Sequence, residues 1–498
     1  LTDRMFLDQD FLAADIYTLE QKQRINTISE EVTMKSKKQG FWEWVNGANV
    51  MYQALHTTGP VTFYQDGINW LTQLINSQMP NPQEIPAMAR MGFGTMGVNF
   101  RDEEIHMGGT FETPTFNAAL FHQSTLNITD KLSAIIGLRL DYDHHSMDYN
   151  APAKVPYGFA LTNDKEPMMA INLQKLSADL LYEGNMKHDY LQLLPKAALR
   201  YEFSKESNVY ASASKGMRSG GYNVQMFSDL LEGALRSSMM SGVKKGVNSY
   251  LDMMKDFGMP EQVIESVKQM VTGNIPDVEA PSVDGVAYKP EYSWNYEVGT
   301  HLSFPEARLQ LDAAVFYVDT RNQQIARFAA SGLGRQMVNA GKSESYGGEM
   351  SLTWRPLEAL SLMANYGFTH ATFKEYAVSE TVDYSGNYVP YVPQHTVNMD
   401  AAYTFDIKGG ELIKSLTLGA NYTGAGKVYW TESNNAAQDF YSLLGARATL
   451  SGKWADLTLW AKNITNTKYN TFYFESASRG FEQHGKPFQV GIDLKIKL

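Results

Sequence analysis

The sequence lacks cysteine entirely, and among its 498 residues no apolar run reaches the roughly 18 residues that a membrane-spanning helix requires. Without cysteine, neither disulfides nor thiolate-ligated metal sites can form. Charged residues are also few, at 19% with a net charge of −11, and no concentrated basic surface is present, so no nucleic-acid partner is expected. The G-x-S-x-G and H-E-x-x-H signatures are missing as well. We therefore predict no catalytic residue, no metal site and no cofactor.

What the sequence does contain is aromatic residues, glycine and segments of strict apolar–polar alternation. It has 28 Tyr, 24 Phe and 39 Gly, and about sixteen to eighteen segments of roughly nine to twelve residues alternate with period two, long enough for tilted strands to cross an outer membrane. The apolar positions are predicted to face lipid and the polar ones a lumen. The residues expected to face outward include Ala134, Leu138, Leu311 and Leu494, and those expected to face the lumen include Arg139, Asp312 and Asp493.

The connections between these segments alternate between short and long. Because every second connection of a meander falls on the same rim, all long loops are expected on one side, facing the cell exterior. This pattern predicts an all-β fold, a transmembrane antiparallel up-and-down β-barrel with long extracellular loops, some partly helical. Short turns are expected near residues 127–131, 204–207, 304–307, 355–359 and 455–456, and long connections at 60–90, 144–189, 218–290, 371–393, 425–439 and 466–487.

Two of the long connections contain apolar residues at helical spacing. Residues 227–272 include a helix-start signal at Pro260 and an apolar stripe, and residues 66–77 repeat the stripe. We interpret both as helices packed across the barrel mouth. The alternative is a docking surface for a ligand or a surface lipoprotein.

Two motifs suggest chemistry that their context does not support. Residues 92–97 (GFGTMG) match a dinucleotide-binding string but lack the preceding buried strand and following helix that such a site needs. His144 and His145 are adjacent on a strand, so their side chains should point to opposite faces and cannot easily chelate one metal ion.

Five phrases of the sequence resemble those of TonB-dependent outer-membrane receptors, in the branch that includes many iron–siderophore transporters. They occur in the family's order, and with an earlier barrel-like phrase at residues 29–52 they span nearly the whole chain. The phrases are YASASKGMRSGGYN at 210–223, KPEYSWNYEVG at 289–299, SYGGE at 345–349, VPQHTVN at 392–398 and LWAKNITNTKY at 459–469.

The resemblance implies a receptor in the outer membrane of a Gram-negative bacterium that imports a scarce, bulky nutrient, with a ferric siderophore favoured as cargo. Vitamin or glycan import, a passive porin and an adhesion barrel remain alternatives. The family has a plug domain and about 22 strands, which leads us to expect that residues 1–498 are the C-terminal part of such a barrel, with the plug and first strands absent. A TonB-type energy-transducing protein acting through that missing N-terminal part, membrane lipid, lipopolysaccharide and a small-molecule ligand are the expected partners.

Candidate ligand-binding residues lie where strands are expected to reach the long-loop rim. Arg218, Tyr222 and Asn223 follow one strand, and Tyr429 and Trp430 follow another. An arginine fork can hold a carboxylate or catecholate, and a tyrosine offers a flat surface with a polar tip. The alternatives are rim packing for the aromatic residues and, for Arg218, an ion pair with a neighbouring Asp or Glu.

Overall fold

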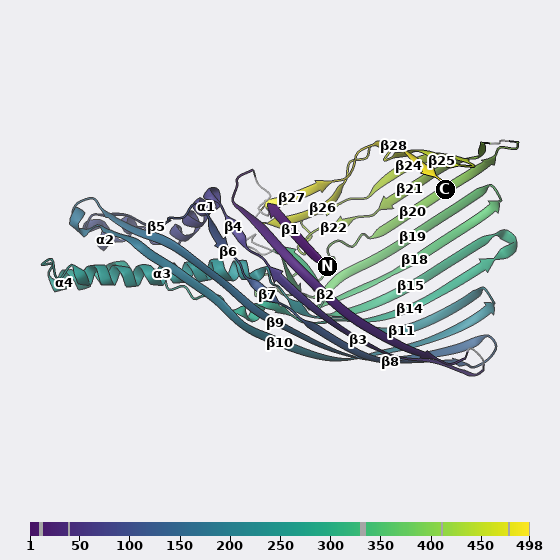
Figure 1. Ribbon diagram of the computed structural model, residues 1–498, viewed down its shortest axis with the longest axis horizontal. Coiled ribbons are helices and arrows are strands. Elements are labelled where there is room, and N and C mark those ends of the chain that lie inside the picture. The colour runs from purple at the N-terminus through teal and green to yellow at the C-terminus, as the bar shows by residue number, and fades with distance from the viewer. Residues whose placement is uncertain (9–12, 38–39, 329–334, 410–411, 477–478, 498) are drawn as a thin grey trace.

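The computed structural model describes residues 1–8, 13–37, 40–328, 335–409, 412–476 and 479–497. Its main feature is a single 20-stranded sheet that curves into a wall, and a narrower arm continues from one part of this wall (Figure 1). Four small two-stranded sheets lie in the connections at the end of the wall from which the arm leaves. No helix in the described part of the chain combines the length and apolar character needed to cross a membrane.

The wall is an antiparallel meander in which each long strand pairs with the next long strand along the chain, as the alternation predicts. Fifteen strands form it in the described residues, slightly fewer than expected. No ladder in this part of the chain joins β28 to β2, so the wall is an open arc. The strands are β2 (Tyr17–Lys35), β3 (Trp42–Thr58), β8 (Thr115–Asn127), β9 (Leu132–Asn163), β10 (Ile171–Ser204), β11 (Ser207–Arg218), β14 (Glu291–Phe304), β15 (Leu309–Arg321), β18 (Lys342–Leu357), β19 (Leu360–Glu375), β20 (His395–Asp406), β21 (Ile413–Ala425), β24 (Tyr441–Gly452), β25 (Ala455–Lys462) and β28 (Gln489–Ile496).

The two faces of the wall differ in polarity as the alternation predicts. Cross-strand register places His301, Asp312 and Ser351 in one row on the inner face, while Leu302, Leu311 and Leu352 form the neighbouring outward row. The two sets of residues expected to face lipid and lumen are correspondingly on opposite faces. Leu494, for example, is 63% exposed on the outer face beside the inward position of Asp493. The outer face therefore suits hydrocarbon and the inner face suits water.

Aromatic side chains border the outer apolar face at two levels, the arrangement expected at the two interfaces of a membrane. The level near the short turns includes Trp42, Phe203, Phe304, Trp354, Phe405 and Trp454, and the opposite level includes Tyr142, Tyr296, Tyr317 and Tyr346, all exposed. Each of the five predicted short turns falls between two wall strands, and the long connections all leave from the other rim.

The arm corrects one prediction. Residues 144–189, expected to be a long loop, instead extend β9 and β10 into one continuous hairpin of 32 and 34 residues per strand. The apolar face changes sides along this hairpin. Below Asp143 the outward residues are apolar, as in Leu138 and Leu140, whereas beyond His145 the inward residues are apolar, as in Met147 and Val155. Because residues 144–189 lack the lipid-facing pattern of the wall, the sequence predicted a loop where the structure has two strands.

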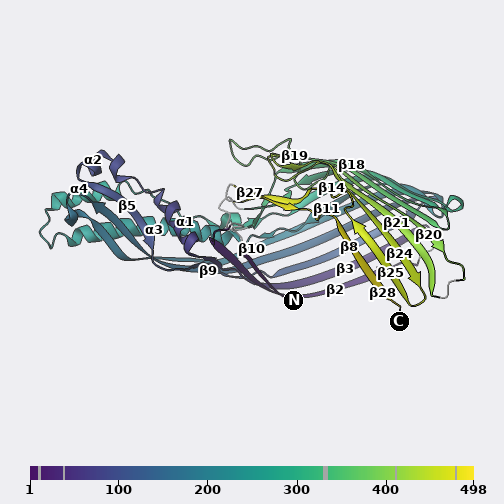
Figure 2. The same cartoon turned by 90° about the horizontal axis from the view of Figure 1, so that it is seen from above.

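The arm has its own hydrophobic core, built between the β9–β10 hairpin and the helices. Tyr157 and Phe159 are fully buried there, together with Leu235 and Val243 of α3. The predicted helices are confirmed, but they lie along the arm and not across the barrel mouth (Figure 2). The arm elements are β1 (Thr2–Asp8), β4 (Val61–Phe63), α1 (Gln65–Asn76), η1 (Pro82–Glu84), α2 (Pro86–Arg90), β5 (Phe93–Phe100), β6 (Ile105–Met107), β7 (Thr110–Glu112), η2 (Pro167–Met169), β12 (Gly221–Tyr222), α3 (Met226–Met253), α4 (Glu261–Thr272), η3 (Val283–Val286) and β13 (Ala287–Tyr288).

Candidate functional site

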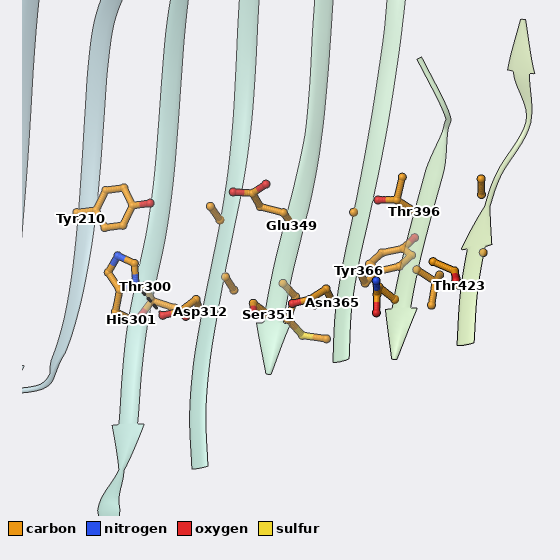
Figure 3. A pocket seen from close by; sticks show the side chains of 18 residues that line it. Tyr210, Thr300, His301, Asp312, Glu349, Ser351, Asn365, Tyr366, Thr396 and Thr423 are labelled. Atoms are coloured by element: carbon orange, nitrogen blue, oxygen red, sulfur yellow. Dashed lines mark hydrogen bonds and ion pairs between the residues drawn. The ribbon is translucent and has the colours of Figure 1, made fainter. Parts of the chain in front are cut away.

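The inner face of the wall carries a hollow of about 640 Å³, lined by polar and apolar side chains, that spans β11 to β21 (Figure 3). The Tyr210 hydroxyl donates a hydrogen bond of 2.6 Å to Glu297, and His301 Nδ1 lies 2.7 Å from Asp312 Oδ1. The Tyr210 and His301 rings stack at 5.6 Å. These bonds join side chains of neighbouring strands, so the hollow is part of the open inner face of the wall and not an enclosed binding pocket.

A second cavity, of about 310 Å³, lies among the long loops above the later strands. The last four long connections between wall strands each contribute residues to its lining. Its volume is at the lower end of the range for small-molecule sites. The short elements of the long connections around it are β16 (Gln324–Phe328), β17 (Arg335–Asn339), β22 (Val428–Tyr429), β23 (Ala437–Gln438), β26 (Asn470–Ser476) and β27 (Arg479–His484), whereas η4 (Pro305–Ala307) lies at a short turn on the opposite rim. We call it the loop cavity.

Aromatic rings form one side of the loop cavity. Tyr391 stacks on Phe472 with ring centroids 5.7 Å apart, and Trp430 meets the Tyr391 ring edge-on at 5.5 Å. Phe474 continues the row, 5.6 Å from Phe472. Such a surface can receive a flat aromatic group by stacking.

Charged side chains complete the lining. Arg327 and Arg335 come from β16 and β17, and Glu432 and Glu475 come from the loops that carry the rings. Burial raises the pKa of Tyr391, and nearby Glu432 acts in the same direction while Arg335 opposes it. The Tyr391 phenol therefore stays neutral at physiological pH. The cavity offers stacking surface, a neutral phenol and two guanidinium groups that can pair with an anion.

The backbone of Tyr391 is held in an uncommon conformation. Its φ of +64° lies in the left-handed region, which costs free energy for a bulky residue. Its N–H donates to the Tyr429 carbonyl at 2.8 Å, which holds the residue there. Asn434 fixes the neighbouring loop by accepting from Tyr388 N–H at 2.7 Å and donating to the Tyr388 carbonyl at 3.0 Å. The cavity is thus preorganised by contacts between loops.

Of the two candidates predicted after β21, Trp430 lines the loop cavity and Tyr429 lies beside it. The Tyr429 ring stacks on Tyr388 with centroids 5.0 Å apart, and Lys427 Nζ lies over the Tyr429 ring, 5.0 Å from its centroid. Tyr429 is therefore engaged by its neighbours in rim packing.

The other three candidates lie where the arm joins the wall, and none is among the residues that line the loop cavity. Arg218 Nη2 donates to the Gln324 carbonyl at 2.9 Å and lies 3.5 Å from Glu291, which is the ion-pair alternative. The Tyr222 hydroxyl lies 3.0 Å from both the His145 carbonyl and His188 Nδ1. Their role as ligand contacts stays a prediction.

Asn223 is buried and exchanges two hydrogen bonds with the backbone of Met337, at 2.8 Å to the carbonyl and 2.7 Å from the N–H. It is therefore bonded to β17, the strand that supplies Arg335 to the loop cavity.

Sequence reasoning missed most of the cavity residues. Tyr391, Arg327 and Arg335 stand in long connections without a phrase of their own, although the Phe-Tyr-Phe run at 472–474 is an aromatic signal in a loop. His144 and His145 point to opposite faces, as expected, and no group of three or more potential ligand side chains in the described residues could hold a metal ion.

Known proteins resemble this chain both in sequence and in fold. A family model described as "TonB dependent receptor-like, beta-barrel" matches residues 9–464. The pesticin receptor of Yersinia pestis is 26% identical over 223 residues, 44% of this chain and 31% of that protein. The probable TonB-dependent siderophore receptor PiuA of Acinetobacter baumannii is 24% identical over 214 residues, 41% of this chain and 27% of that protein.

Among solved structures, the ferric yersiniabactin uptake receptor FyuA from Yersinia pestis superposes with a TM-score of 0.63 at 18% identity, covering 97% of this chain and 56% of the receptor. The match therefore spans about a third of the curated relatives' length and just over half of the solved receptor's.

Proposed function

Because this chain belongs to the TonB-dependent receptor β-barrel family, whose members are bacterial outer-membrane receptors and not enzymes, we propose that it forms the outer part of a ferric siderophore importer. In this proposal the loop cavity receives the ligand. The observation that carries it is the combination of a stacked aromatic row, Tyr391 to Phe474, with Arg327 and Arg335 in one small cavity.

The aromatic row and the two guanidinium groups of the cavity support a planar ligand with anionic oxygens on the arginine side, while Glu432 and Glu475 lie elsewhere in the lining. Phenolate and catecholate groups present a flat ring for stacking and oxygens for a guanidinium fork. A neutral glycan would make little use of the two arginines. The names of the relatives agree with this choice, since one matched receptor takes up ferric yersiniabactin and another is a probable siderophore receptor.

The remaining parts of the mechanism extend the proposal to the whole protein. Residues 1–498 would be the C-terminal barrel portion, and a plug domain with further strands would complete the barrel. A TonB-type protein would act on that N-terminal part to supply energy, while lipid and lipopolysaccharide surround the apolar outer face. The long connections that contain residues 60–90 and 218–290 would face the cell exterior.

Calorimetry of the full-length protein tests the ligand class directly. The panel is ferric yersiniabactin, a ferric tricatecholate, cobalamin, haem and a maltooligosaccharide. We expect tight binding by a ferric complex and loss of that binding in an Arg327→Gln, Arg335→Gln double variant, which keeps a polar N–H donor at each position but removes both charges. Tight binding of the neutral oligosaccharide alone, unaffected by the double variant, would contradict both the ligand class and the cavity. Free diffusion of unrelated solutes through the purified protein in liposomes would favour the porin alternative.

A further inference from the structure

The β16–β17 hairpin, which supplies both arginines of the loop cavity, is bonded along one side to the root of the arm. Its first rung is the pair of Gln324 and Asn339. Gln324 is buried, accepts from Arg218 on its carbonyl at 2.9 Å, and donates from its side chain to the Ser219 carbonyl at 2.8 Å. Asn339 is bonded in both directions to the backbone of Lys289, at 2.8 and 2.9 Å.

Further along the hairpin, two side chains of the arm root take the place of a third strand. The Asn223 amide accepts from Met337 N–H and donates to the Met337 carbonyl, as a neighbouring strand would. Gln225, immediately before α3, accepts from Arg335 N–H at 2.8 Å. The planar amide of Asn223 carries, on two separate atoms, the donor and the acceptor that the Met337 pairing uses together.

We infer that Asn223 and Gln225 are positioning residues for the loop cavity, through which the arm sets the place of Arg327 and Arg335. The inference rests on the proposed function for the ligand, but its structural part does not. Met337 pairs with Ala326, next to Arg327, and Arg335 is bonded through its own N–H. A shift of the arm root therefore moves both arginines relative to the aromatic row, which belongs to other loops.

The arm root is in turn fixed to the rest of the arm and to wall strand β2. Asn223 N–H donates to the Val286 carbonyl at 2.8 Å, and the Gln225 amide donates to Gln21 of β2 at 3.1 Å. Met226 begins α3, whose buried residues belong to the arm core. Binding in the cavity and the position of the arm are thus coupled through one short segment, and such coupling is reciprocal.

The test compares variants of the full-length protein by hydrogen exchange at residues 335–339 and by ferric yersiniabactin binding. Asn223→Leu has nearly the same size but neither hydrogen bond, so we expect the amides of Met337 and Arg335 to exchange about tenfold faster or more, and affinity to fall by about five- to thirtyfold. Gln225→Leu should act similarly. Gln225→Glu keeps the acceptor for Arg335 N–H and loses only the donor to Gln21, so its exchange and affinity should lie closer to the wild-type values than those of Gln225→Leu.

Ser237→Ala is the matched control, because it removes a hydrogen bond of 2.6 Å to the Val278 carbonyl inside the arm without touching β17. It should change neither readout. Saturating probe should slow exchange at 335–339 in Asn223→Leu, which a purely structural defect would not show. Unchanged exchange in both leucine variants would overturn the inference, and so would faster exchange with unchanged affinity. If the wild type fails to bind the probe, the ligand proposal fails for that probe, and the exchange measurement still decides the positioning role.

Discussion

The hydroxyl of Tyr391 donates a hydrogen bond of 2.8 Å to the backbone carbonyl of Tyr473. The two residues are 82 positions apart and belong to different long loops, one between β19 and β20 and the other within β26. Together with the stacking of Tyr391 on Phe472, this bond makes the aromatic side of the loop cavity a joint between loops. The cavity's shape therefore depends on contacts that no single loop provides.

Tyr391→Phe should loosen this joint without removing the stacking ring. The change deletes one hydrogen bond between loops, which typically contributes about 0.5–1.5 kcal/mol. We expect faster hydrogen exchange in residues 470–476 and 388–394 and a small loss of ligand affinity. Tyr391→Ala should reduce affinity much further, since it also removes the ring. Equal affinities for the two variants would show that the ring does not contact the ligand.

Trp430→Ala and Tyr429→Ala form a matched pair for locating the ligand. Trp430 lines the cavity, whereas Tyr429 stacks on Tyr388 beside it. Loss of the indole should weaken binding of a planar ferric complex by about 1–3 kcal/mol, the scale of a well-packed aromatic contact. Tyr429→Ala should cost much less. Calorimetry with the same ligand decides, and the reverse order of effects would place the ligand on the Tyr388 side.

The fold of the wall could be predicted from the sequence because each strand carries its own evidence. A row such as Leu309, Leu311 and Ala313 alternates with polar neighbours, and a membrane imposes that alternation at every strand. The short turns at 204–207 and 304–307 follow from the same pattern. Strand order then needed no long-range information, since each strand pairs with the next.

The arm and the loop cavity could not be predicted in the same way. The apolar side chains of the extended β9–β10 hairpin change faces near His145. They point outward in the wall and inward in the arm, so one alternation pattern does not describe the whole strand. The cavity requires Arg327, Trp430 and Phe472 to meet from three separate connections, and nothing in their local sequence specifies that meeting. The sequence places Asn223 at the rim, but its pairing with Met337 depends on tertiary contacts alone.

Val315→Arg and Ala314→Arg test the assignment of the two faces of the wall. Val315 is 60% exposed on the outer face, and Ala314 lies on the inner face opposite Glu349. An arginine facing lipid near the bilayer midplane costs about 2–4 kcal/mol. We expect Val315→Arg to lower the unfolding free energy in lipid bilayers by that order, while Ala314→Arg gains a nearby carboxylate and changes stability little. Similar losses for both would mean that the outer face does not meet hydrocarbon.

The ion pair of Asp400 and Arg447 tests how much lumen pairing stabilises the later strands. The guanidinium makes two hydrogen bonds to the carboxylate, at 2.7 and 2.9 Å, across β20, β21 and β24. Arg447→Met leaves a partly buried carboxylate unpaired and should lower the unfolding free energy by about 1–3 kcal/mol. The double variant with Asp400→Asn should recover part of this loss. Additive losses in a double-mutant cycle would show that the two side chains do not interact energetically.

Tyr222 provides a pH prediction for the root of the arm. Burial raises its pKa to about 12, with smaller contributions from Tyr190 and Asp189. A tyrosine with a raised pKa favours the folded state in its neutral form, so its contribution is complete below about pH 10, its ordinary value, and is lost as the pH rises toward 12. The hydroxyl also bonds to the His145 carbonyl and to His188, and an ionised phenolate could no longer donate to that carbonyl.

We therefore expect hydrogen exchange at residues 219–225, corrected for the intrinsic pH dependence of exchange, to accelerate between about pH 10 and 12 in the wild type. In Tyr222→Phe, residues 219–225 should be less protected already at pH 8 and should show a weaker rise in that window. Phenolate absorbance at 295 nm, taken as the difference between the two proteins, should report the titration of Tyr222 itself. A difference spectrum that titrates near pH 10 would show that the hydroxyl is solvated and that the arm root is not docked through it.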